Sequence, residues 1–247
     1  MVAATTSGTG QVSRFAGTLI DLLDRVSYRR VSLSEQFDPV YRLRYDAYRR
    51  EDFVPINSQR VTIDPFDYSP NVFCYGVYID GALVSSVRFH HVTPEVPDSP
   101  GRSVWPEVLD PVLADGGSYI DPSRFTADHE ASLAFPALPF LTLRIVVMAA
   151  IHFEARYVLS AVRAEHGAFY KRVFNSMQMG EPRNFAELTF PMVLFMADVP
   201  LIKEQVFSRY PFFRSTAEER HALFEGQHTR AIRPSVRLAQ PRLVAAE

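Results

Sequence analysis

A tight turn at Asp80-Gly81 places the strongest constraint on the fold of this chain. It joins two β-rich runs, FCYGVYI and ALVSSVRFHHV, between Asn71 and His91. An Asp-Gly pair tolerates the positive φ angles of a tight turn, so the two runs are predicted to form an antiparallel hairpin. With 247 residues and a hydrophobic content of 47%, the chain can bury one sizeable core around it.

The remaining segments alternate between helical and strand patterns, without an internal repeat or an interdomain linker. Apolar residues recur at helical spacing from Ser13 to Val26, and Ser34 is predicted to cap a helix from Glu35 to Arg50. Residues 93–117 are predicted to form a long loop with a helical turn at 105–113. Further strands are predicted at 28–33, 118–127, 157–162 and 188–197, and further helices at 138–154, 167–174, 200–210 and 216–225.

This order predicts an α/β (α+β) fold with a mixed sheet and helices on both of its faces. One domain is expected over residues 13–227, after a disordered leader at 1–12 and before a tail at 228–247. No stretch reaches the roughly 20 apolar residues of a membrane helix. The first ten residues also lack the pattern of a secretion signal, so we expect a cytoplasmic location without a membrane segment.

Charge and cysteine content exclude several classes of function. A net charge of −2 and a pI near 6.4 give no overall field that would hold nucleic acid. The single cysteine, Cys74, excludes an internal disulfide and is expected to be a small buried residue of a strand. The histidines do not fall at ligand spacing, so no metal site is predicted.

Four short segments place charges where a purely structural pattern would not. An arginine buried alone in a strand costs several kcal/mol, about 3–5, so each needs a carboxylate partner. One interpretation is that the arginines and aspartates pair to fix a loop onto the sheet, and another is that the aspartates only form turns. A network of this kind can also shape a polar substrate site. The segments contain Arg44 with Tyr48, Asp64 with Asp67, Arg88, and the run Asp121-Pro122-Ser123-Arg124-Phe125.

In this order, these motifs resemble the acyl-homoserine-lactone (autoinducer) synthases and the related N-acyl amino acid synthases. The resemblance covers roughly residues 40–128. It implies a GNAT-like three-layer fold with a V-splayed sheet, and N-acyl transfer from a thioester to an amine. Asp121, Arg124 and Tyr170 are then the candidate catalytic residues. The implied substrate-binding residues are Arg44, Tyr48, Phe53, Asp64, Asp67, Arg88, Ser123 and Phe125.

Two departures from the family pattern bear on the acceptor. Asp121 replaces the family's glutamate and is one methylene shorter. Phe53 stands near the place of a tryptophan that is usual in the autoinducer synthases. These departures favour an amino acid as acceptor over S-adenosylmethionine.

A second resemblance lies in the predicted helix at 167–174. Its Phe169-Tyr170 and Phe174 are similar to the GNAT pattern FY-x-x-x-F, in which the tyrosine protonates the leaving thiolate. The alternative is that Tyr170 only packs the helix on the sheet. His166, just before it, is interpreted as a surface or capping histidine.

The donor is predicted from the stretch Asp128 to Pro136. A GNAT enzyme that uses coenzyme A normally has a glycine-rich loop here, whose N–H groups hold the pyrophosphate. This stretch has no glycine and carries two acids, which favours the acyl-phosphopantetheine thioester of an acyl carrier protein, with acyl-CoA as the alternative. No bound cofactor is expected. The seven arginines of residues 25–50, against three acids, form a candidate docking face for this acidic carrier or an ordinary solvated surface.

The chemistry we expect is attack of an amine on the thioester, with Asp121 as general base and backbone N–H groups at a strand bulge stabilising the oxyanion. The arginines Arg88 and Arg124 are expected to bind a substrate carboxylate or to brace the aspartates. The predicted function is transfer of a long-chain fatty acyl group from acyl carrier protein to an amino acid. The alternatives are an acyl-homoserine-lactone synthase that uses S-adenosylmethionine, and a non-catalytic domain that binds acyl ligands.

Overall fold

The predicted hairpin forms the middle of the sheet in the computed structural model, which describes residues 13–32, 38–184, 190–226 and 231–235. Strand β2 (Val72–Ile79) pairs antiparallel with β3 (Ala82–Val92). Asp80 and Gly81 take φ angles of 51° and 83° between them, so the turn has the backbone conformation that an Asp-Gly pair allows.

Eight strands form the sheet in the described part of the chain, in the order β1-β2-β3-β4-β5-β8-β6, with β7 also paired to β8. Among the described strands, only β4 and β5 are parallel neighbours. They pair at Tyr119 with Tyr157 and at Ile120 with Val158, and then separate. The sheet is therefore open between the later residues of these strands. The other strands are β1 (Val26–Arg30), β4 (Tyr119–Ala127), β5 (Tyr157–Val162), β6 (Met177–Gln178), β7 (Arg183–Asn184) and β8 (Pro191–Asp198).

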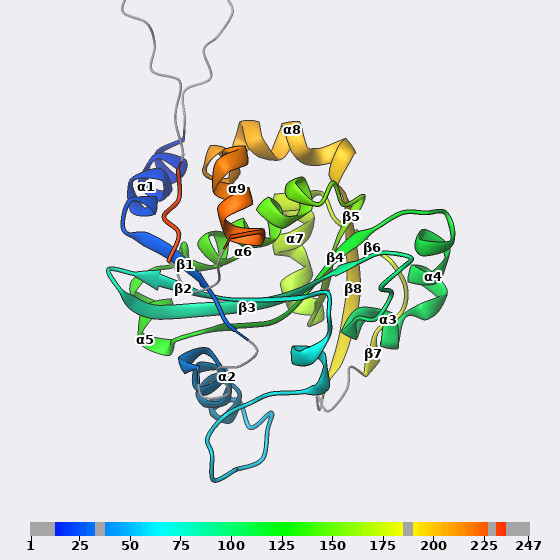
Figure 1. The fold of residues 1–247 in the computed structure, drawn as a ribbon, viewed down its shortest axis with the longest axis horizontal. Coiled ribbons are helices and arrows are strands. Elements are labelled where there is room, and N and C mark those ends of the chain that lie inside the picture. Colours follow the sequence, from blue (N-terminus) through cyan, green and yellow to red (C-terminus); the bar gives the residue numbers. More distant parts are fainter. Residues whose placement is uncertain (1–12, 33–37, 185–189, 227–230, 236–247) are drawn as a thin grey trace, which may run out of the picture.

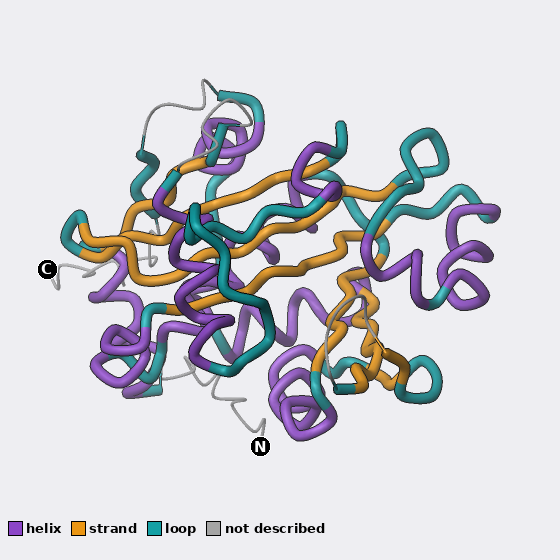
Figure 2. Tube along the Cα trace, turned by 90° about the horizontal axis from the view of Figure 1, so that it is seen from below, coloured by secondary structure: helices purple, strands orange, loops and turns teal. Residues whose placement is uncertain are grey.

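Helices cover both faces of the sheet (Figure 1). On one face lie α1 (Arg14–Leu23), α6 (Leu138–His152), α7 (Gly167–Phe174), α8 (Val199–Arg209) and α9 (Ala217–Phe224). On the other face, α2 (Pro39–Arg50) and the loop after it lie across the strands, as the view from below shows (Figure 2). The shorter helices are α3 (Pro100–Val104), α4 (Pro106–Ala114), α5 (His129–Ala134) and the 3-10 turns at Pro65–Tyr68, Ala164–His166 and Pro211–Phe213.

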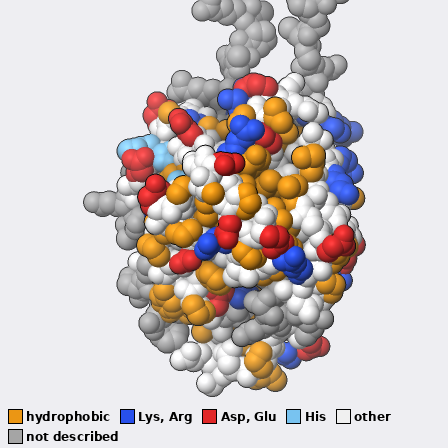
Figure 3. Space-filling view, turned by 90° about the vertical axis from the view of Figure 1, so that its right-hand side faces the viewer, with side chains coloured by type: hydrophobic (Ala, Val, Ile, Leu, Met, Phe, Trp, Pro, Cys, Tyr) orange, Lys and Arg blue, Asp and Glu red, His pale blue; other side chains and the backbone are white. Residues whose placement is uncertain are grey.

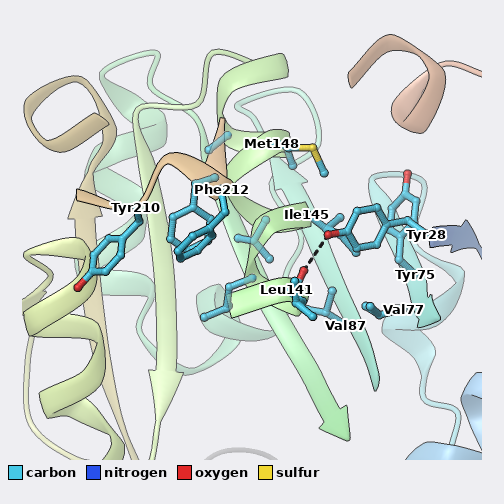
Figure 4. Packing of buried hydrophobic residues seen from close by; sticks show 14 of the residues in the cluster. Tyr28, Tyr75, Val77, Val87, Leu141, Ile145, Met148, Tyr210 and Phe212 are labelled. Atoms are coloured by element: carbon cyan, nitrogen blue, oxygen red, sulfur yellow. Dashed lines mark hydrogen bonds between the residues drawn. The ribbon is translucent and has the colours of Figure 1, made fainter. Parts of the chain in front are cut away.

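The main core surrounds α6, which is apolar on nearly all sides and is therefore buried on nearly all sides. Leu141, Ile145 and Met148 of this helix pack toward β1, β2 and β3 (Figure 4). The Tyr28 hydroxyl donates a hydrogen bond of 3.0 Å to the carbonyl oxygen of Leu141, which ties β1 to α6. On the opposite face, a smaller core around Trp105 and Leu109 seats α3 and α4 on β4, β5 and β8.

Several predicted boundaries were wrong. The helix predicted from Glu35 begins at Pro39, where Asp38 Oδ1 accepts the Val40 N–H at 2.9 Å; Ser34 lies outside the described residues. Proline fits this first helical position because its nitrogen needs no partner there. The segment 93–117 contains two helices in place of one turn, and residues 129–134 form a helix that was not predicted.

The ends of the chain are only partly described. The predicted leader at 1–12 lies outside the described residues, as does most of the predicted tail at 228–247. Within that tail, Ile232 forms an antiparallel bridge with Tyr28, so this part of it lies against β1. No helix in the described ranges combines the length and apolar character of a membrane span.

Candidate acyl-transfer site

A cavity of about 850 Å³ occupies the place where β4 and β5 separate. This volume is within the range of small-molecule sites, roughly 300–1,000 Å³. Residues of α2, the loop at 53–66, β3, β4, α6, β5, α7, β8 and α8 line it. Eight of the eleven predicted site residues are among them: Tyr48, Phe53, Asp64, Arg88, Ser123, Arg124, Phe125 and Tyr170.

An ion-pair network forms the polar end of the cavity. Asp64 Oδ1 accepts a hydrogen bond from Arg88 Nη1 at 2.7 Å, and Asp64 Oδ2 accepts two from Arg124, at 2.9 and 2.5 Å. Arg88 Nε also donates to Ser123 Oγ at 3.0 Å, which links β3 to β4. Burial alone would raise the pKa of Asp64, but the guanidinium groups of Arg88 and Arg124 outweigh it and lower this pKa to about 2. Asp64 is therefore an ionised anchor.

A second, fully buried layer holds this network in place. Arg44 Nη1 lies 2.8 Å from Asp67 Oδ1, and Arg88 Nη1 lies 3.0 Å from Asp67 Oδ2. Asp67 also accepts the backbone N–H of Asp64 at 3.0 Å, so the two aspartates cap one 3-10 turn. Arg44 and Asp67 do not line the cavity. They brace the loop that carries Asp64. The sequence had offered such bracing for Arg88 and Arg124, and the structure extends it to Arg44.

Strand β4 contains a bulge at the cavity. Ser86 pairs with Thr126 and Arg88 with Ser123, so the two residues Arg124 and Phe125 face the single Val87. Arg124 has a φ of 51°, a conformation that residues other than glycine rarely adopt and that costs about 1–3 kcal/mol. A bulge leaves backbone groups outside the ladder of the sheet. N–H groups released in this way are suited to a developing oxyanion.

Aromatic side chains form the wall next to Arg124. The Arg124 guanidinium lies 5.4 Å from the centre of the Tyr48 ring. Phe53 follows Tyr48 with ring centres 6.4 Å apart, and Phe190 lies 4.8 Å beyond Phe53. The rings are tilted against each other, by 52° and 58°, and together they make one side of the polar end aromatic.

The rest of the cavity is apolar and long. Residues of α6 from Pro139 to Ile151 face it on successive turns, a length of roughly 18 Å along the helix axis. Side chains of β5, α7 and α8 close the other sides, including Val158, Phe174, Ile202 and Phe207. An extended hydrocarbon chain is the kind of group that such a space accommodates.

Tyr170 lies on α7 and lines the same cavity. The helix can approach β8 closely because Gly167 has no side chain: a Cβ there would lie 2.5 Å from the Phe195 ring. Burial raises the pKa of the Tyr170 phenol to about 12, so the phenol keeps its proton at neutral pH. A neutral phenol in this position can donate a proton.

Asp121, the predicted base, is not among the residues that line the cavity. Its carboxylate is buried beneath α3, where Oδ2 accepts the backbone N–H of Gly101 at 2.7 Å, and it does not line the cavity. Burial raises the pKa of Asp121, against hydrogen bonds from Ser99 and Gly101 that lower it. The structure thus leaves the Asp121 side chain out of the cavity lining, although the residues that follow it in β4 line the cavity.

Sequence reasoning missed several residues that line the cavity, among them Arg163, Phe190 and Lys203. No motif marks them: Arg163 follows β5, Phe190 precedes β8 and Lys203 lies in α8, and these segments meet only in the fold. His166, interpreted from the sequence as a surface or capping residue, is exposed and also lines the cavity. No group of His, Cys, Asp and Glu in the described ranges is arranged to hold a metal ion.

Solved structures share this fold at low sequence identity. FeeM from uncultured soil microbes, an N-acyl amino acid synthase, has a TM-score of 0.60 and 17% identity over 75% of this chain and 97% of that chain. The CoA-dependent acyl-homoserine lactone synthase BjaI, solved with SAM and isopentyl-CoA, has a TM-score of 0.53 and 14% identity over 75% of this chain and 90% of that chain. These likenesses confirm the predicted GNAT-like three-layer fold. No curated protein matches the sequence.

A family model gives the assignment. The model of the N-acyl amino acid synthase FeeM matches residues 39–198, well beyond the residues 40–128 that carried the resemblance. The matched region includes the polar network, the β4 bulge, α6 and Tyr170. The chain belongs to the FeeM family of N-acyl amino acid synthases and is an N-acyltransferase.

Proposed function

We propose that this N-acyltransferase moves a long-chain fatty acyl group from the thioester of an acyl carrier protein to the amine of an amino acid. The observation that carries this proposal is the shape of the cavity. It joins a polar end, built from Asp64, Arg88 and Arg124, to an apolar space that follows α6 for roughly 18 Å. A fatty acyl chain and a zwitterionic amine match these two ends.

In the proposed reaction, the amine nitrogen attacks the thioester carbonyl carbon, and the C–S bond then breaks. Backbone N–H groups at the Arg124–Phe125 bulge stabilise the oxyanion, and the Tyr170 phenol gives its proton to the thiolate. The amine also loses a proton. Asp121 is the predicted base, although its carboxylate does not line the cavity; His166 lines it and offers a second acceptor.

The acceptor is proposed to be an amino acid because cations surround the polar end. Arg124 and Arg163 both line the cavity and both lie against aromatic rings, Tyr48 at 5.4 Å and Phe190 at 5.0 Å. A guanidinium that lines a cavity recognises a carboxylate by charge-assisted hydrogen bonds. Asp64, held ionised, is placed to attract the ammonium group.

The donor is proposed to be carrier-bound because of the segment before α6. In place of a glycine-rich loop, residues 129–134 form α5, and Asp128 accepts the N–H of Ala131 at 2.9 Å at its start. Glu130 lies in the first turn of the same helix. These carboxylates repel a pyrophosphate and occupy an N–H group that would bind it.

The test compares donors and acceptors in separate reactions. The protein is incubated with long-chain acyl carrier protein or with acyl-CoA, and each donor is offered either pooled amino acids or S-adenosylmethionine. Thiol release and mass spectrometry of the lipid product report turnover. We expect N-acyl amino acids from the carrier protein donor. A product formed only with S-adenosylmethionine would contradict the proposal that the acceptor is an amino acid. Faster turnover with acyl-CoA than with acyl carrier protein would contradict the proposed donor.

A further inference from the structure

Positive charge gathers on α7 and α8, beside the cavity. These helices carry Lys171, Arg172, Lys203 and Arg209, all exposed, against one acid, Glu204. Lys171 and Lys203 are the only lysines of the chain. In a protein with a net charge of −2, the two helices therefore have a local excess of three positive charges. We call these four side chains the α7–α8 basic face.

The charges of this face are not neutralised by neighbours in the described ranges, where the four residues make no ion pair. Lys171 Nζ lies 5.4 Å from the centre of the Phe195 ring, and the Arg209 guanidinium lies 5.4 Å from that of its neighbour Tyr210. The charges thus face solvent and can act on a partner that approaches.

The arginine-rich segment 25–50, interpreted from the sequence as either a docking face or an ordinary solvated surface, is different. Four of its arginines pair with carboxylates of the same chain: Arg25 with Asp80, Arg29 with Asp38, Arg44 with Asp67, and Arg49 with Asp52. Arg44 is also fully buried. Much of the positive charge counted in the sequence is therefore neutralised within the fold. This segment has fewer unpaired cations for an acidic partner than its composition suggested.

The α7–α8 basic face borders the cavity directly. A hollow of about 50 Å³ between the helices is lined by Lys171, Arg172 and Arg209, with amide and apolar side chains around them. Ile202 and Val206 of α8 line both this hollow and the cavity. Lys203, on the same helix, lines the cavity as well. One helix thus separates the basic surface from the space proposed for the acyl chain.

Exposed apolar side chains accompany these charges. Leu201 of α8 is 78% exposed and Met177 of β6, three residues after α7, is 66% exposed. Exposed large apolar side chains are typical of surfaces that bind another protein. The surface seen from the right-hand side of Figure 1 carries Lys and Arg, Asp and Glu, and hydrophobic side chains next to one another (Figure 3).

We propose that the α7–α8 basic face docks the acidic carrier protein that presents the acyl group on its phosphopantetheine arm. The carrier's carboxylates meet the four cations, and the arm enters the cavity past Lys203. This inference rests on the proposed function and names the surface through which its donor is recognised. The alternative is that these cations only stabilise their own helices. Lys171, Arg172 and Arg209 lie in the last turns of α7 and α8, where a positive charge interacts favourably with the helix dipole.

The test uses the triple variant K171Q/R172Q/R209Q, which leaves every cavity-lining residue unchanged. Two donors are compared, long-chain acyl carrier protein and the same acyl group on free pantetheine, which lacks the protein. We expect the KM for the carrier protein to rise about tenfold or more and its salt dependence to weaken. Turnover of the pantetheine thioester should stay within about twofold of the wild type.

The matched control is R14Q/R42Q/R50Q, which removes three exposed charges from α1 and α2. We expect it to use both donors like the wild type. An equal loss with both donors in the first variant, or a larger loss with the carrier protein in the control, would overturn the docking surface. Failure of the wild type with both donors would instead contradict the proposed function.

Discussion

The carboxylate of Asp121 accepts the backbone N–H of Gly101, with 2.7 Å between Oδ2 and the nitrogen. A Cβ added to Gly101 would lie 2.9 Å from the same oxygen, so α3 rests directly on the carboxylate. Asp121→Ala leaves this N–H without a partner and should lower the free energy of unfolding by about 1–3 kcal/mol. Denaturant unfolding of the wild type and of Asp121→Ala measures this change in the free energy of unfolding.

The variant Asp121→Asn separates this contact from a role as base, because an amide oxygen can still accept the N–H but cannot take a proton. We expect its kcat to stay within about tenfold of the wild type, because the Asp121 side chain does not line the cavity. A loss of about a hundredfold or more with unchanged stability would establish Asp121 as the base predicted from the sequence.

Tyr170→Phe removes the proposed proton donor and keeps the ring that packs on Phe169 and Phe174. With a pKa of about 12, the phenol is neutral at pH 7, so its loss should lower kcat by about 10²-fold while KM changes little. Steady-state kinetics report both constants. Tyr68→Phe, at an exposed position, is the control. An unchanged kcat in Tyr170→Phe would leave Tyr170 with a packing role only.

Asp64 should make the stability of the fold depend on pH under acidic conditions. Its pKa is lowered from 3.8 to about 2, so the folded protein favours the ionised form. The resulting stability is fully present above about pH 5 and is lost as the pH falls toward 2, by up to about 2 kcal/mol. Unfolding of the wild type and of Asp64→Asn is compared across this range. The difference between them should narrow as the pH falls, and a constant difference would contradict the assignment.

Glu219→Ala should destabilise the protein without altering the chemistry of the cavity. Arg144 binds Glu219 through two contacts, at 2.6 and 3.0 Å, and both side chains are buried. Removal of the carboxylate leaves a buried guanidinium without its counter-charge, at a cost of about 3–5 kcal/mol. Its remaining partners, among them the carbonyl oxygens of Phe212 and Arg214 and the sulfur of Met148, carry no full negative charge. Thermal unfolding measures the change, with Glu204→Gln on the exposed side of α8 as control. Equal melting temperatures would exclude a stabilising role for the pair.

Local signals in the sequence were sufficient for the elements near the hairpin. Asp80-Gly81 identified β2 and β3 because the conformation of a tight turn depends on only two residues. The strand at 157–162 and the helix at 167–174 have the predicted bounds. The start of α2 was wrong because Ser34 and Asp38 are both good caps, and only the structure shows which carboxyl or hydroxyl meets the first N–H groups.

Within the site, the spacing of Asp64, Asp67, Arg88 and Arg124 indicated a network, and the structure shows the pairs that compose it. Spacing could not show that Asp121 turns toward α3, since this depends on where residues 99–101 pack. For the same reason, the sequence left open whether residues 25–50 form a docking face or an ordinary solvated surface, and the structure shows that four of their arginines pair within the fold.

The sequence by itself determined the order of most strands and helices, because each of these depends on residues close together in the chain. The order and spacing of short motifs also indicated the family and the set of charged residues around β3 and β4. The tertiary structure decided which of those residues line one cavity and which brace it from behind. It also placed Tyr170, Lys203 and Arg124 around the same space, although they are far apart in sequence. The physical reason is the separation of β4 and β5 after two paired residues, which opens the sheet beside α6.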